Sequence, residues 1–158
     1  MFEAVVAAVA LALGNPLLVA VALGMLPISE VRGAAIYAFS VGQPWLIVPA
    51  AAANMLVCPA ILLFWRVLDI PRWGRLILGG RLEGKLLSMG KRYETWGLLG
   101  VAVFIGMPLP LTGVYSGTLV AELLGINRWH TLAAAVAGVV MAAAVMFVVL
   151  GGLALMLG

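Results

Sequence analysis

The stretch GMLPISEVRGA, residues 24–34, decides how the rest of the chain is interpreted. Its Glu30 and Arg32 stand in an apolar region, because positions 4–29 and 33–65 carry no charged side chain. Pro27 removes a backbone hydrogen bond from any helix that contains it, and charges at membrane depth need partners. The stretch therefore predicts a break in a membrane-embedded helix.

A second copy of this break follows 83 residues later. The segment PISEV (27–31) aligns with PLTGV (110–114), so each copy reads proline, aliphatic, hydroxyl, any residue, valine. Each copy also follows a Gly-Met step, at 24–25 and at 106–107. Paired breaks in two apolar halves of a chain point to the binding site of a transporter.

The composition indicates an integral membrane protein. Hydrophobic residues make up 65% of the chain, charged residues only 9%, and the mean hydropathy is +1.21. Soluble domains carry about 25% charged residues. Four uncharged runs exceed the ~20 residues that cross a hydrocarbon core, and their continuity argues against a β-barrel. We expect one all-α transmembrane domain over residues 1–158, with the single Cys58 buried and in no intrachain disulfide.

The basic residues predict the orientation. Seven of the nine lie between Arg66 and Arg92, a distribution typical of a membrane surface and not of a nucleic-acid binder. The positive-inside rule places residues 66–94 in the cytoplasm and the protein in the cytoplasmic membrane. Within this segment, apolar side chains at helical spacing predict an amphipathic helix on the inner leaflet: Leu82, Leu86, Met89 and Tyr93.

The remaining segments divide into two similar halves. Residues 16–42 and 95–125 each consist of two apolar arms about half a membrane long, which predicts two re-entrant hairpins; one continuous helix is the alternative for the first. Residues 44–65 and 128–157 predict full transmembrane helices. The halves then have opposite orientations, as an inverted repeat. Residues 1–15 either continue into the first hairpin as a kinked span or lie low in the membrane.

The hairpin tips hold the candidate substrate-binding residues. We expect Ser29 and Thr112 to cap the second arm of each hairpin, so that two positive helix ends face the membrane centre. With Arg32 and the adjacent Gly113, these ends favour an anionic group such as a phosphate or carboxylate. Asn54, near the middle of its span, either ties helices together or lines the same site. The helix-stopping residues of the motif are Pro27, Pro108 and Pro110.

The charged residues of the hairpins could serve the structure or the function. Side chains two apart on a helix do not face each other, so Glu30 and Arg32 are expected to have separate partners. Glu30 is either the proton-coupling carboxylate or a structural partner of a cation or helix end. Arg32 is a counter-charge for the substrate or for the structure. Glu122 is expected to be an interfacial acid that reaches Arg128 only if its helix continues.

Three segments together resemble the small multidrug export protein family, which is distantly similar to the DedA superfamily of membrane transporters. They are LPISEVRGA (26–34), ANMLVCP (53–59) and MPLPLTGVYSGTLVAELLG (107–125). The resemblance covers roughly residues 20 to 150, with Tyr37 where the family has a proline and Leu111 where it has a glycine. The DedA resemblance implies proton-coupled transport, or transbilayer movement, of lipid-linked or amphiphilic molecules.

We therefore expect a proton-coupled membrane transporter for an anionic, amphiphilic or lipid-linked molecule or a small drug-like compound. An uncoupled lipid flippase or scramblase and a non-transporting scaffold or assembly factor are the alternatives. The sequence contains no catalytic set, metal-ligand spacing or cofactor motif, so we expect no enzyme. Two spans are few to enclose two polar tips, which favours a homodimer with membrane lipids as further partners and no nucleic acid.

Overall fold

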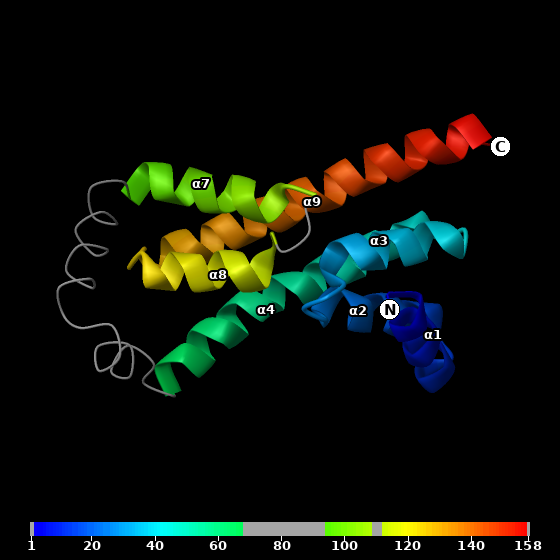
Figure 1. The fold of residues 1–158 in the computed structure, drawn as a ribbon, viewed down its shortest axis with the longest axis horizontal. Helices are drawn as coiled ribbons and strands as arrows, with labels where there is room; N and C mark the ends of the chain where they lie inside the picture. The colour runs from blue at the N-terminus through cyan, green and yellow to red at the C-terminus, as the bar shows by residue number, and fades with distance from the viewer. Residues whose placement is uncertain (1, 68–93, 109–111, 158) are drawn as a thin grey trace.

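The computed structural model describes residues 2–67, 94–108 and 112–157, and every regular element among them is a helix (Figure 1). This confirms the predicted all-α class. The predicted amphipathic helix and Pro110 fall outside the described residues. The elements are α1 (Phe2–Leu13), α2 (Pro16–Met25), α3 (Glu30–Ser40), the 3-10 helix η1 (Pro44–Leu46), α4 (Ile47–Val67), α7 (Glu94–Gly106), α8 (Val114–Leu123) and α9 (Arg128–Leu157).

Two of the described helical segments are long and apolar enough to cross a membrane. Pro44–Val67 contains 24 residues and Arg128–Met156 contains 29. At ~1.5 Å per residue, each exceeds the ~30 Å of a hydrocarbon core. Their positions agree with the predicted spans, although α4 continues past residue 65 to Val67.

The chain breaks at both predicted places. Between α2 and α3 the carbonyl of Leu26 accepts hydrogen bonds from the backbone N–H groups of Ser29 (3.1 Å) and Glu30 (2.8 Å), which closes a tight turn. Glu30 has a φ of 50°, in the left-handed region. The alternative of one continuous helix over 16–42 is therefore wrong. In the second half α7 ends at Gly106 and α8 begins at Val114, so each predicted hairpin consists of two separate helices.

The N-terminal helix is separate from the first hairpin. Gly14, with a φ of 61°, follows α1, and Asn15 has extended backbone angles. The side chain of Asn15 accepts a hydrogen bond from the N–H of Leu17 at 2.9 Å and caps α2, which begins with Pro16. A side-chain cap and a proline in the first turn both favour a new helix start. The idea of a kinked continuation is therefore wrong, and α1 instead packs against α2.

The two hairpins meet at their helix ends. Figure 1 shows the α2–α3 turn near the centre of the molecule, close to the C-terminal end of α7 and the N-terminal end of α8. Each hairpin packs against the long helix that follows it, α2 on α4 and α7 on α9. The second arms also reach across, because α3 contacts α9 and α8 contacts α4. The core therefore lies where α4, α9 and the hairpins meet, and it positions the two turns.

Glycines set the closest helix approaches. A Cβ on Gly24 in α2 would lie 2.5 Å from the carbonyl oxygen of Ala50 in α4. A Cβ on Gly138 in α9 would lie 2.6 Å from Cβ of Ile105 in α7. Small residues on one face of α9 are buried in this packing, namely Ala134, Ala135 and Gly138, whereas Ala133 is exposed.

Gly24→Ala should lower the thermal unfolding midpoint in detergent. The added methyl group meets backbone atoms, which cannot rotate away, and overpacking of this kind costs about 1–3 kcal/mol. Gly100→Ala is the matched control, because nothing lies within 4 Å of its Cβ position. There alanine should stabilise the helix slightly, by roughly 0.5–1 kcal/mol or less. Equal midpoints for the two variants would contradict the close α2–α4 approach.

Candidate functional site

Arg32 in the first hairpin binds the turn of the second hairpin. Its Nη2 donates to the carbonyl of Ile105 at 2.9 Å, to the carbonyl of Met107 and to Oγ1 of Thr112 at 3.2 Å. Its Nη1 donates to the carbonyl of Thr112. The first two carbonyls belong to the C-terminal end of α7, where carbonyls lack helical partners and the helix dipole is negative. The guanidinium group therefore caps α7.

Glu30 binds the start of α8. Its Oε1 accepts a hydrogen bond from the backbone N–H of Tyr115 at 3.5 Å, and the N–H of Val114 also donates to the carboxylate. A Cβ on Gly113 would overlap the carboxylate, so a larger residue at this place would displace the Glu30 side chain. Free N–H groups and a positive dipole make a helix N-terminus favourable for an anion. Here the anion is supplied by the chain itself.

Glu30 and Arg32 also contact each other. Oε2 of Glu30 lies 3.8 Å from Nη1 of Arg32, and the two side chains are 9% and 17% exposed. Each residue has its own partners, as expected, but the expectation that they do not face each other is wrong. That argument assumed regular helical backbone, whereas Glu30 has a φ of 50° at the first position of α3.

The second hairpin also donates a hydrogen bond to the first. The hydroxyl of Tyr115 donates a hydrogen bond to the carbonyl of Met25, at the C-terminal end of α2. Tyr115 stands 83 residues after Arg32, the same separation as between the two proline motifs. Sequence reasoning missed Tyr115, and extending the aligned segment by one residue would have found it. We name the mutual contacts the hairpin clasp, formed by Met25, Glu30, Arg32, Ile105, Met107, Thr112, Gly113, Val114 and Tyr115.

The predicted caps take other roles. Ser29 occupies the N-cap position of α3, but its buried hydroxyl has no hydrogen-bond partner among the described residues. Thr112 is not the cap of α8, because Gly113 holds that position. Thr112 Oγ1 donates instead to the carbonyl of Met107 at 2.8 Å. The capping prediction for Thr112 is wrong because the carboxylate of Glu30 occupies the N–H groups that a hydroxyl would cap.

The other predicted residues lie around the clasp. Pro27 is in the first turn and Pro108 in the second. Asn54 and Cys58 lie one turn apart on α4, both with no exposed surface. Neither amide atom of Asn54 has a hydrogen-bond partner among the described residues. Whether Asn54 ties helices or lines a site therefore stays a prediction.

Glu122 reaches Arg128 without a continuous helix. Its carboxylate interacts electrostatically with the guanidinium of Arg128, although α8 ends at Leu123. Gly125, with a φ of 67°, turns the chain back so that α9 begins beside the end of α8. The prediction that Glu122 reaches Arg128 only if its helix continues is therefore wrong.

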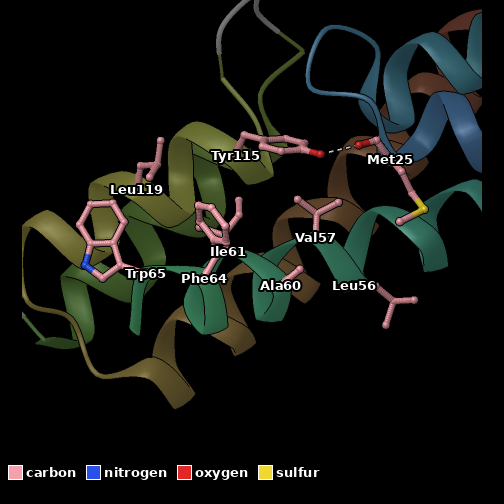
Figure 2. Close-up of a pocket in the computed structure, with 9 residues that line it drawn as sticks. All are labelled: Met25, Leu56, Val57, Ala60, Ile61, Phe64, Trp65, Tyr115 and Leu119. Atoms are coloured by element: carbon pink, nitrogen blue, oxygen red, sulfur yellow. Dashed lines mark hydrogen bonds between the residues drawn. The ribbon is translucent and has the colours of Figure 1, made fainter. Parts of the chain in front are cut away.

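An apolar groove of about 500 Å³ lies beside the clasp (Figure 2). The hydrogen bond from Tyr115 to Met25 belongs to its wall, and Trp65 lies at the opposite end in Figure 2. The groove is lined by side chains of α2, α4 and α8: Met25, Leu56, Val57, Ala60, Ile61, Phe64, Trp65, Tyr115 and Leu119. In the part of the chain that the structure describes, no three His, Cys, Asp or Glu side chains group to hold a metal ion.

Two discontinuous helical hairpins joined through their helix ends, with two helices long enough to cross a membrane, define a helical membrane protein. The chain matches the family model described as "Putative small multi-drug export protein" over residues 30–145, and it belongs to this family. The match extends from Glu30 into α9, and the family name indicates a general transporter role. Comparisons with curated proteins and with solved structures give no match. The similarity to the DedA superfamily stays a prediction.

Arg32→Lys should destabilise the protein although it keeps the charge. A single ammonium group cannot reproduce the fork that reaches separate carbonyls, and hydrogen bonds from charged groups are worth roughly 1.5–3 kcal/mol. Thermal unfolding in detergent measures the loss. Arg66→Lys, at the exposed end of α4, should leave the midpoint unchanged. If Arg32→Lys unfolds at the wild-type temperature, the carbonyl contacts do not hold the clasp.

Proposed function

We propose that this protein is a proton-coupled transporter that moves an anionic amphiphile, lipid-linked or drug-like, across the cytoplasmic membrane. The observation that carries the proposal is the position of the Tyr115–Met25 hydrogen bond, which belongs to the hairpin clasp and to the wall of the apolar groove. A molecule lying in the groove therefore touches the junction of the two hairpins. Binding there can bias whether the hairpins stay joined.

The arrangement of the helices supports an inverted repeat. Helices α2, α3 and α4 form one half, and α7, α8 and α9 form the other. The two halves pack in the same way, since α3 of the first half contacts α9 and α8 of the second half contacts α4. In transporters built from inverted repeats, discontinuous helices meet at the substrate site. We infer that both hairpins are re-entrant and that residues 66–94 face the cytoplasm, as their charges predict.

The groove suits the apolar part of the substrate. Its wall on α4 extends from Leu56 to Trp65, roughly 14 Å at the rise of an α-helix. Arg66 follows Trp65 at the end of α4, a pairing typical of a membrane interface. An acyl chain or apolar drug in the groove would start at this interface and end at the clasp. A negative head group is then within the same region as Arg32, whose carbonyl partners it would replace.

Glu30 gives the clasp a response to protons. It is the only buried carboxylate among the described residues. When ionised, it holds the N–H groups at the start of α8 and attracts Arg32. Protonation removes the charge and weakens both interactions, so the second hairpin separates more easily. A proton and a substrate that favour the same separated state are thereby coupled.

We also propose a homodimer. The turn of the first hairpin is incompletely covered within one chain, since Ile28 is 70% exposed and Met25 46% exposed. Irregular backbone at membrane depth needs protein around it, and a second copy related by a two-fold axis would provide it.

Blocking the groove should stop transport. Ala60→Trp fills the groove, whereas Leu63→Trp adds the same ring on the exposed side of α4. In proteoliposomes with a pH gradient, Ala60→Trp should reduce the initial uptake of a fluorescent dodecyl phosphate about tenfold, because the ring occupies the volume of the tail. Leu63→Trp should transport like the wild type. Equal uptake by the two variants would rule out the groove as the substrate path.

Glu30→Gln should uncouple transport from the pH gradient. Glutamine keeps the shape and can still accept hydrogen bonds from α8, but it does not titrate. We expect the variant to bind dodecyl phosphate, measured by tryptophan fluorescence, and to lose the acceleration of uptake by the gradient. Glu3→Gln, which changes an exposed acid, is the control.

The outcomes separate the alternatives. Full pH-driven uptake by Glu30→Gln would assign Glu30 a structural role, and uptake by the wild type that ignores the gradient would indicate an uncoupled flippase. A wild-type protein that moves neither dodecyl phosphate nor the cationic dye ethidium would be a scaffold and not a transporter.

A further inference from the structure

The contact between α4 and α8 carries polar side chains in an otherwise apolar protein. Asn54 and Cys58 are four residues apart on α4, and Thr118 and Glu122 are four apart on α8, so each pair lies on one helix face. Thr118 lies beside the Cys58 thiol, and Glu122 is close enough to interact with the same thiol electrostatically. Asn54, Cys58 and Thr118 have no exposed surface. The four side chains therefore lie along the contact between the two helices, and we name them the α4–α8 polar row.

Asn54 needs a partner that the neighbouring side chains do not supply. Its amide can make four hydrogen bonds, yet both Oδ1 and Nδ2 are buried without a partner among the described residues. Buried polar side chains are almost always hydrogen-bonded, to protein or to ordered water. A wholly buried amide with free donors and acceptors therefore points to a small polar ligand at this place, and water is the simplest.

The polar row begins at the hairpin clasp. The carboxylate of Glu30 accepts hydrogen bonds at Val114 and Tyr115, and Thr118 lies one helical turn beyond Val114. Helical side chains lean toward the N-terminus of their helix, so the hydroxyl of Thr118 leans toward Glu30. In Figure 1, α4 passes the centre of the molecule, and its C-terminal half and α8 extend toward the same end.

The polar row ends at Glu122, near the C-terminal end of α8. Glu122 is partly exposed, lies one turn beyond Thr118 and interacts with Arg128. Successive members of the row on α8 are about 6 Å apart along the helix, a gap that one or two water molecules bridge. The charged and titratable groups along this line in the described chain are Glu30, Arg32, Tyr115, Cys58, Glu122 and Arg128.

We propose that water fills the α4–α8 polar row and connects Glu30 with Glu122 as a proton path to one face of the membrane. The path serves the proton coupling proposed above, while its hydration does not depend on transport. Each transfer breaks one O–H bond and forms another along the chain of waters. The net change is one proton moved between the Glu30 carboxylate and the aqueous phase beside Glu122.

Cys58 is a native probe of this path, because the chain has one cysteine. We expect the small water-soluble reagent 2-aminoethyl methanethiosulfonate to modify Cys58 in proteoliposomes about tenfold faster than an equally buried cysteine in an apolar core, since access controls thiol modification. The comparison is Ala142→Cys in the Cys58→Ala chain, because Ala142 is 1% exposed. Equal rates at the two positions would overturn the proposal.

A second pair of variants tests the hydroxyl. Thr118→Val keeps the side-chain shape and should slow the modification of Cys58, whereas Leu119→Val, on the groove side of the same helix, should not. Unchanged labelling in Thr118→Val would also count against the path. Fast labelling of Cys58 in a protein that shows no pH-driven uptake would support the hydrated row and contradict the proposed transport. The two proposals can therefore fail separately.

Discussion

A helix that stops inside a membrane leaves backbone N–H and C=O groups where no water can reach them, and each such group is costly. The hairpin clasp supplies the missing partners from the opposite hairpin. Arg32 serves the carbonyls that end α7, Glu30 serves the N–H groups that begin α8, and Tyr115 serves the carbonyl of Met25 at the end of α2. Neither hairpin is complete alone, so the two halves of the chain depend on each other.

The same contacts explain the backbone of Glu30. A residue other than glycine with a φ near 50° costs about 1–3 kcal/mol and persists only where its surroundings hold it. The strained conformation turns the carboxylate toward α8 while Arg32 reaches α7, so one short stretch binds both helix ends of the second hairpin. Because the charges are opposite and 3.8 Å apart, the pair also remains neutral as a unit. This accounts for two charged residues inside an apolar region.

The ends of the helices could be predicted from the sequence, whereas the hydrogen-bond partners at the hairpin clasp could not. Prolines, glycines and uncharged runs act locally, so the ends of α2, α3, α8 and α9 could be placed from the sequence to within about two residues. The cap of α8 could not, because Glu30, more than 80 residues away, displaced Thr112 from that role. Tyr115 was missed for the same reason, since its hydroxyl acts on a distant carbonyl.

Under the proposed function, Arg32 would serve the structure and the substrate in succession. Both Nη atoms donate to the second hairpin, while Nε is buried without a partner among the described residues. A phosphate or carboxylate is a stronger acceptor than a neutral carbonyl, so an anion that reaches this position can replace the carbonyls of Met107 and Thr112. Such a replacement would free the end of α7 and thereby loosen the second hairpin. Arg32 joins the two hairpins, and an anionic head group that bound Arg32 would therefore separate them.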